Sequence, residues 1–457
     1  MNHDDETKRS ALLIAVLAAF LTPFMVSSIN IALPAIGREF NMSAIAMSWV
    51  PTAYLLSAVV FLVPLGRLAD IYGRKKIFSY GIKVYSLTAM LLALSPSGPF
   101  FIALRLLEGF GGAMIFGTGT AIVTSVFPPG ERGRVLGINV AAIYLGLSLG
   151  PSFGGFLTQQ FGWRSIFLTN IPIGLLVLYL LSSKLHGEWV GSRGERFDRT
   201  GAVIYGIMLA AFMLGLSSLP TPKGLALIIV SVACMGIFVR WEMNTESPLL
   251  DLKLFADNMT YTFSNLAALI NYSATFAVTF LLSLYLQYIK GFTPQHAGMI
   301  LVSQPIIMSL VSPFAGRLSD RIETRVVASL GMVITSVGLF LFAHISSDVH
   351  VKYIVLGLML LGFGFALFSS PNTNAVMGSI DKRFYGVGSA TLGTMRLTGQ
   401  MLSMGIAMVV FAIYMGGAVI TPEMYSLFLT SMKTAFIIFS SLCFIGVFAS
   451  LARGKMR

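Results

Sequence analysis

The sequence is poor in charged residues and in cysteine. Only 11% of its 457 residues are charged and 56% are hydrophobic, with a mean hydropathy of +0.81. A soluble core of this length could not hide so much apolar surface, so we expect the chain to lie in a lipid bilayer. Its two cysteines, Cys234 and Cys443, fall inside apolar runs, which excludes a disulfide framework and a zinc site with cysteine ligands.

The sequence also lacks the residue patterns of an enzyme or an ATP-driven pump. It contains no Cys/His/Asp cluster, no nucleophile elbow and no Walker loop. We therefore expect no enzymatic activity, no metal ion and no cofactor.

Long apolar runs dominate the sequence instead. A spanning helix needs about 20 apolar residues, and about fourteen such runs are separated by Gly, Pro or charge. The pattern predicts an all-α integral membrane protein with about 14 transmembrane helices. The runs fall near residues 11–36, 43–65, 77–95, 99–123, 134–158, 166–183, 200–218, 224–240, 259–288, 295–315, 325–344, 351–371, 385–414 and 430–452.

Basic residues indicate the orientation. The 31 Lys and Arg outnumber the 19 Asp and Glu, giving a formal net charge of +12. With a cytoplasmic N-terminus, about 22 basic residues fall in cytoplasmic segments and about six in outer ones, which matches the retention of positive charge inside. This asymmetry favours an even number of helices and two cytoplasmic termini. The net charge thus indicates topology and contact with anionic lipid, and gives no reason to expect a nucleic-acid partner.

A charged loop occurs twice. GRLADIYGRKK spans residues 66–76, and a shortened copy, GRLSDR, spans 316–321. Two related halves suit a carrier that works by alternating access, in which a charged loop at the cytoplasmic seam latches one state. Retention of positive charge on the cytoplasmic side is enough to explain Lys75 and Lys76. It does not explain an acid such as Asp70. The candidate latch residues are Gly66, Asp70, Gly73, Arg74, Gly316 and Asp320.

Three motifs resemble those of the major facilitator superfamily. GRLADIYGRKK is similar to the signature loop of that family, RLLEGFGGA from Arg105 to its fourth-helix motif, and GLSLGPSFGG, residues 146–155, to its fifth-helix antiporter motif. The chain resembles the fourteen-helix branch, drug:proton antiporter family 2. The resemblance implies a six-helix bundle over 1–183, an inserted transmembrane hairpin with cytoplasmic linkers over 184–258, and a second six-helix bundle over 259–457.

Small residues are repeated in the fifth span. Glycines at mostly four-residue spacing allow close approach of a partner helix, and the proline bends the helix. Ordinary packing explains any single glycine, but the whole array favours the antiporter motif, which accompanies export in this family. Its members are Gly146, Gly150, Pro151, Gly154 and Gly155.

The fourth span carries two charges. Arg105 lies within the apolar run, where a lone charge is costly, and corresponds to the arginine assigned to proton transfer in the family. Glu108 replaces the usual Gln and lies three residues on, on the same helix face. We expect Glu108 to bind and release a proton during transport, with Arg105 tuning it. A neutralised structural pair that never releases its proton is an equally good interpretation.

One departure from the family bears on the substrate. The first span has Met25 where these antiporters usually carry Asp, and no acid besides Glu108 lies within the spans. Burial of an unpaired cation costs several kcal/mol, so multiply charged cations are disfavoured as substrates. Arg396 gives the cavity a positive centre, which favours a neutral, zwitterionic or anionic amphipath.

Polar and aromatic residues within the spans are candidates for the substrate cavity. For each one, hydrogen bonding between helices is the alternative role. The candidates are Asn30, Tyr54, Tyr144, Asn271, Tyr272, Gln287, Asn372, Asn374 and Arg396.

These features predict a secondary transporter that exports small amphipathic molecules in exchange for protons. We expect a monomer in the plasma membrane, surrounded by lipid. The alternatives are an exporter of a lipid or anionic metabolite, and a non-transporting receptor or scaffold on the same fold.

Overall fold

The computed structural model describes residues 3–185, 187–191, 195–246, 248–250, 252–319, 321–381 and 385–454, and these contain helices but no β-strand. The helices are α1 (His3–Glu39), α2 (Ala44–Tyr72), α3 (Arg74–Ala93), α4 (Gly98–Val126), α5 (Pro129–Phe161), α6 (Arg164–Ser183), α7 (Arg199–Ser218), α8 (Pro222–Asn244), α9 (Lys253–Asp257), α10 (Met259–Thr275), α11 (Ala277–Leu284), the π-helix η1 (Tyr285–Ile289), α12 (Pro294–Leu301), α13 (Ser303–Ser319), α14 (Thr324–Phe342), α15 (Val351–Gly378), α16 (Tyr385–Tyr414), the 3₁₀-helix η3 (Pro422–Met424) and α17 (Tyr425–Ala452).

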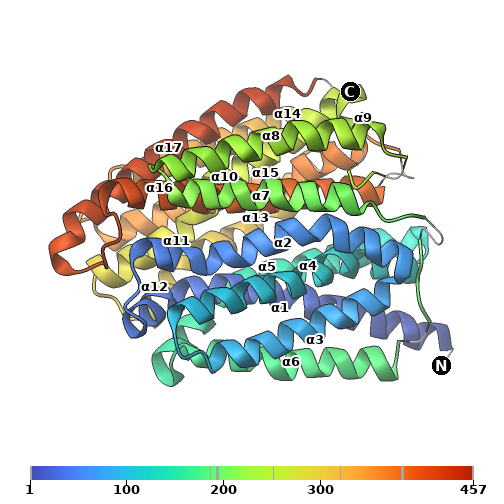
Figure 1. Ribbon diagram of the computed structural model, residues 1–457, viewed down its shortest axis with the longest axis horizontal. Coiled ribbons are helices and arrows are strands. Elements are labelled where there is room, and N and C mark those ends of the chain that lie inside the picture. Colours follow the sequence, from blue (N-terminus) through green and yellow to red (C-terminus); the bar gives the residue numbers. More distant parts are fainter. Residues whose placement is uncertain are drawn as a thin grey trace.

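Thirteen helical segments in the described part of the chain are long and apolar enough to cross a membrane. The remaining predicted span, near 77–95, is helix α3, which begins with three basic residues and carries Lys83 in its middle. It lies side by side with the other helices (Figure 1). The predicted all-α membrane fold with about 14 spanning helices is therefore confirmed.

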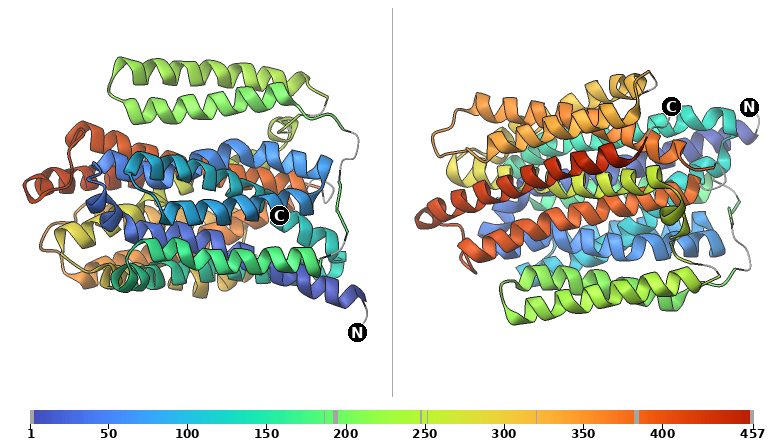
Figure 2. Two further views of the ribbon diagram at one scale, coloured as in Figure 1. Left: turned by 60° about the horizontal axis from the view of Figure 1, so that its bottom comes forward. Right: turned by 90° about the horizontal axis from the view of Figure 1, so that it is seen from above.

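The helices pack in two groups. In the first, α1 packs on α5, α4 lies between α2 and α3, and α3 also contacts α6. In the second, α14 contacts α15 and α17, and α10 contacts α16 and α17. The hairpin α7–α8 stands outside both groups (Figure 2), with α7 against α2 and α16. The domain boundaries expected from the sequence stay a prediction.

Both chain termini lie at the same end of the molecule (Figure 1). We call this the termini end, where α1 begins and α17 ends, and the opposite end, where α1 ends and α17 begins, the far end. The α2–α3 junction lies at the termini end, because α2 runs away from the far end. The connection from η1 to α12 lies at the far end.

Helix α5 packs on α1 through glycines. A Cβ atom on Gly146 would lie 2.6 Å from the backbone oxygen of Phe20, and one on Gly150 would lie 1.8 Å from Ser27 Oγ. Ser28 Oγ donates a hydrogen bond of 3.0 Å to the Gly150 carbonyl oxygen. Only glycine lets the two backbones approach this closely, so the glycine array sets the separation of α1 and α5.

We predict that Gly146→Ala will destabilise the protein, because its new methyl group meets backbone atoms that cannot rotate away. Overpacking of this kind costs about 1–3 kcal/mol, and a lower melting temperature in detergent would report it. Gly137→Ala is the matched control, since it lies on the same helix and its Cβ would meet nothing within 4 Å. Equal melting temperatures for the two variants would contradict the packing account.

Candidate functional site

A buried ion pair lies at the centre of the first group of helices. Arg105 and Glu108 of α4 are 1% and 0% exposed, and Arg105 Nη1 donates to Glu108 Oε2. Arg105 Nε donates to the Val50 carbonyl oxygen of α2 at 3.1 Å, and its Cζ lies 4.8 Å from the centre of the Tyr54 ring. The pair is thus bonded to α2 as well as to its own helix.

Tyr85 of α3 completes this cluster and was not predicted. It is fully buried beside Glu108. The glycines of GFGGA are the signal that could have found it. A Cβ atom on Gly111 would lie 2.9 Å from the Tyr85 backbone nitrogen, and one on Gly109 would lie 2.3 Å from the Tyr54 carbonyl oxygen. These glycines bring both neighbouring helices against the ion pair.

The charged loop between α2 and α3 is built around a second ion pair. Arg74 Nε donates to Asp70 Oδ1 at 2.8 Å, and Arg74 Nη1 donates to Ser125 Oγ of α4 at 2.7 Å. Gly73 has a φ of 118°, which L side chains rarely adopt. Gly66 packs against α4, since a Cβ atom on Gly117 would lie 3.5 Å from its Cα. The predicted residues of this first loop therefore lie together.

The chain that follows α6 closes over this loop. Both carboxylate oxygens of Glu188 accept from the first turn of α3, Oε1 from the Lys75 amide at 2.8 Å and Oε2 from the Lys76 amide at 3.2 Å. The Trp189 carbonyl oxygen accepts from the Arg74 amide, and the Gly191 amide donates to the Asp70 carbonyl oxygen, each at 3.0 Å. We call Glu188, Trp189 and Gly191 the linker clasp.

No feature of the sequence marks the linker clasp except an acid in a basic segment, because its contacts join residues more than a hundred positions apart. Gly73 also makes room for it, since a Cβ atom there would lie 2.5 Å from Glu188 Cδ. Of the shortened second loop, Gly316 lies on α13, where a Cβ atom would come within 3.1 Å of Ser370 Oγ. Asp320 lies outside the described residues.

At the far end, the two groups of helices touch through paired glycines. A Cβ atom on Gly155 would lie 2.5 Å from the Pro294 carbonyl oxygen of α12, and one on Gly298 would lie 2.0 Å from the Pro151 carbonyl oxygen of α5. Gly298 was not predicted. We call this contact of α5 with α12 the far-end seam.

Two predicted cavity residues lie in a neighbouring contact at the same end. Ser283 Oγ of α11 donates to the Asn30 carbonyl oxygen of α1 at 2.6 Å. Gln287 Nε2 donates to the Ile31 carbonyl oxygen at 2.9 Å. Both Asn30 and Gln287 are buried where the two groups meet.

Three further cavity candidates meet near the middle of the molecule. Arg396 of α16 donates through Nη2 to Thr373 Oγ1 at 2.7 Å, and its Cζ lies 5.7 Å from the centre of the Tyr272 ring. Tyr144, from the first group, places its hydroxyl 3.5 Å from Ser312 Oγ of α13. We call Tyr144, Tyr272, Ser312, Thr373 and Arg396 the interface cluster. Thr373 and Ser312 were not predicted.

The remaining candidates contact neighbouring helices. Tyr54 lies beside the buried ion pair described above, and the other three lie near polar groups of adjacent helices. The Asn271 amide lies 3.9 Å from Cys443 Sγ of α17, Asn372 donates to the Ser264 carbonyl oxygen of α10 at 3.1 Å, and Asn374 donates to Ser319 Oγ of α13 at 3.0 Å. In each case the contact joins two helices of the second group.

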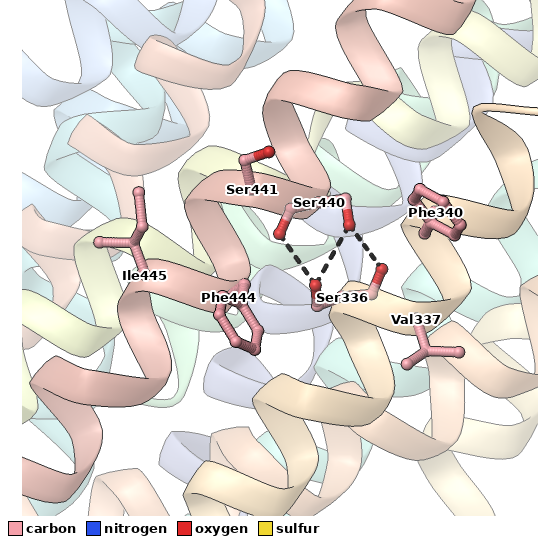
Figure 3. A pocket seen from close by; sticks show the side chains of 7 residues that line it. All are labelled: Ser336, Val337, Phe340, Ser440, Ser441, Phe444 and Ile445. Carbon is pink, nitrogen blue, oxygen red and sulfur yellow. Dashed lines mark hydrogen bonds between the residues drawn. The ribbon is translucent and has the colours of Figure 1, made fainter.

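A pocket of about 390 Å³ lies on the outer side of the second group, between α14 and α17 (Figure 3). Ser336 and Ser440 form its floor, and each hydroxyl donates to the carbonyl oxygen of the other residue at 2.9 Å. Because these hydroxyls already bond to each other, the pocket is explained by the packing of two helices. Phe340 and Phe444 flank it.

We predict that Glu188→Ala will loosen the linker clasp. The substitution removes a carboxylate that caps a helix N-terminus, an interaction worth about 0.5–2 kcal/mol. The amides of Lys75 and Lys76 should then exchange with deuterium faster than in the native protein. Glu246→Ala changes an exposed acid in the other linker and should leave these amides unaffected; unchanged exchange in Glu188→Ala would contradict the clasp.

Sequence comparisons relate this chain to known membrane transporters. The sequence profile described as Major Facilitator Superfamily matches residues 15–188 and 265–455. The chain is 27% identical over 443 residues to the riboflavin transporter RibZ of Clostridioides difficile (strain 630), covering 95% of each chain. It is 29% identical over 427 residues to the multidrug resistance protein Stp of Mycobacterium tuberculosis (strain CDC 1551 / Oshkosh), covering 90% of this chain and 78% of that one.

Solved structures show the same fold. The crystal structure of the peptide transporter POT in complex with sulfate superposes with a TM-score of 0.69 at 15% identity, covering 97% of this chain and 98% of that one. The profile matches far more than half of the chain. The chain therefore belongs to the Major Facilitator Superfamily of membrane transporters.

Proposed function

We propose that this transporter exchanges protons for small amphipathic molecules and exports them by alternating access. The buried pair of Arg105 and Glu108 carries the proposal. A charge in the middle of a spanning helix is costly and is usually functional, and Glu108 adds a group that can bind a proton. The names of relatives, which include a multidrug resistance protein and a riboflavin transporter, support small-molecule transport.

The pair offers a way to couple protons to helix movement. When Glu108 is charged, Arg105 is neutralised and holds α2 through the Val50 carbonyl oxygen and the Tyr54 ring. When Glu108 takes up a proton, Arg105 loses its counter-charge while it remains buried. Because an uncompensated buried charge is strongly unfavourable, the packing of α2 against α4 should change with each proton.

Alternating access requires the two groups of helices to separate at one end at a time. The far-end seam is closed in this structure, with Gly155 and Gly298 against the opposite backbone. Opening it would expose the interface cluster to the far side. The excess of basic residues at the other end supports cytoplasmic termini and a far end that faces outward. We infer a plasma-membrane location from the same argument.

The hairpin α7–α8 belongs with neither bundle in this proposal. We assign 1–183 and 259–457 to the two rocking bundles and 184–258 to the hairpin with its linkers. Helix α7 contacts α2 of the first bundle and α16 of the second, so it covers one line along which the bundles meet. A single chain then contains all parts of the transport path, which supports a monomer in direct contact with lipid.

Export of an anionic metabolite is the second candidate. Arg396 supports it, because the ion pairs of the described part of the chain do not include this side chain. A positive centre of this kind disfavours cations and above all dications.

We predict that Glu108→Gln will abolish proton coupling. In proteoliposomes with an acidic interior, a pH-sensitive dye should record loss of the gradient when a transported amphipath is added to the native protein. The variant should behave like empty vesicles. Because it leaves Arg105 buried without a counter-charge, the double variant with Arg105→Gln serves as a folding control. Full proton movement in well-folded Glu108→Gln would contradict the assigned role.

We also predict that Asp70→Asn will slow substrate turnover severely without unfolding the protein. The variant loses the charge that pairs with Arg74 at 2.8 Å, in a part-exposed position where such a pair contributes only about 0–1 kcal/mol to stability. Asp257→Asn, at the exposed end of α9, is the control. Native turnover in Asp70→Asn would remove the loop from the latch mechanism.

A further inference from the structure

Within the described part of the chain, the interface cluster contains a cation without a counter-ion beside an aromatic platform. We propose that this cluster binds flat aromatic molecules that carry a carboxylate. The proposal rests on the transport function proposed above and names its substrate class.

Arg396 has unused hydrogen-bonding capacity. Its guanidinium has five N–H donors; Nη2 donates to Thr373, while Nε is buried without a partner. Arg396 forms no ion pair with any carboxylate in the described part of the chain. A buried donor left unpaired is destabilising, so a ligand with acceptor atoms stabilises this site. A carboxylate fits best, since it accepts two parallel N–H bonds from one guanidinium.

The platform beside this cation is aromatic. The centre of the Tyr272 ring lies 5.7 Å from Arg396 Cζ. Phe365 packs edge-on against Tyr272, with ring centres 5.3 Å apart and ring planes at 89°. Gly399, one helical turn after Arg396, fixes this arrangement. A Cβ atom there would lie 2.8 Å from Tyr272 Cβ, so only glycine lets α16 approach α10 closely enough. A flat ring gains more from such a surface than an aliphatic chain does.

The same position is reached from the first group of helices. Tyr144 of α5 lies close enough to Tyr272 and Arg396 for electrostatic interaction, and its hydroxyl lies beside Ser312 of α13. An aromatic acid on Arg396 would thus touch both bundles. Binding at a contact that changes between two states shifts their populations, which gives this ligand class a means to drive the transport cycle.

Cations lack a corresponding site in the cluster. The one acid deep within the described spans of the first group, Glu108, is bonded to Arg105. A ligand with an ammonium group would therefore meet Arg396 without a carboxylate to offset the repulsion. The site should rank ligands as anion over neutral over cation when their ring systems are the same.

The test is isothermal titration calorimetry on the purified full chain in detergent with four matched probes. These are 2-naphthoate, its neutral amide 2-naphthamide, the cation 2-naphthylmethylammonium and the saturated analogue decahydronaphthalene-2-carboxylate. We expect 2-naphthoate to bind at least tenfold more tightly than each of the others.

Variants assign the preference to individual side chains. Arg396→Gln should remove the preference for naphthoate over naphthamide, and Tyr272→Leu should remove the preference for naphthoate over its saturated analogue. Arg164→Gln changes an exposed arginine that pairs with Glu39 at the far end and should bind all probes as the native protein does. If Arg396→Gln does not fold, Arg396→Lys keeps the charge but loses the planar fork, and should still weaken naphthoate binding several-fold.

Two results would overturn the proposal: equal affinity for naphthoate and naphthamide in the native protein, or an Arg396 variant without its expected effect, which is loss of the anion preference in Arg396→Gln and weaker naphthoate binding in Arg396→Lys. Neither result would test proton coupling, which the Glu108→Gln experiment measures separately. Conversely, naphthoate binding without any proton movement would contradict the antiport mechanism and leave the substrate class standing.

Discussion

The buried ion pair between Arg105 and Glu108 constrains the whole first group of helices. Two charges inside a membrane domain are tolerated only when their polar atoms find partners. Here Arg105 bonds to Glu108 and to the α2 backbone, and the glycines of GFGGA let α2 and α3 close around the pair. Any change in the charge of Glu108 must therefore be accommodated by the packing of three helices, which is what a proton-driven conformational switch needs.

The other proposed elements lie at different depths along the molecule. The far-end seam closes one side through Gly155 and Gly298, the interface cluster around Arg396 lies near the middle, and the linker clasp covers the charged loop at the termini end. The proposed proton site is separated from the interface cluster, since Glu108 is fully buried within the first group. Coupling in this account passes through the movement of whole bundles and requires no direct contact between proton and substrate.

The sequence predicted the fold well because each spanning helix corresponds to one local apolar run. Each apolar run is continuous, and its length alone decides whether it can cross a bilayer. Even α3 was predicted correctly despite Lys83. The break after Thr275 and the π-helix over Tyr285–Ile289 were not predicted, since neither is marked by Pro or Gly. Such irregularities depend on contacts with other helices.

Site residues were harder to predict because their partners also lie on other helices. The motifs identified Arg105, Glu108, Asp70 and Arg74, which the structure brings into two ion pairs. Polar residues within spans gave a weaker signal, because Asn271 and Asn372 hydrogen-bond between helices just as a cavity residue would to a ligand. Glu188 and Thr373 find their partners only through tertiary structure.

If the charge of Glu108 controls how the bundles pack, as proposed, we expect protonation of Glu108 to open the far-end seam. Double electron–electron resonance between spin labels at Gln160 and His296, with Cys234 and Cys443 replaced by serine, measures that opening. We expect a longer distance on acidification, and the same longer distance in Glu108→Gln at every pH. A single distance that neither acid nor the variant changes would rule out proton-driven opening.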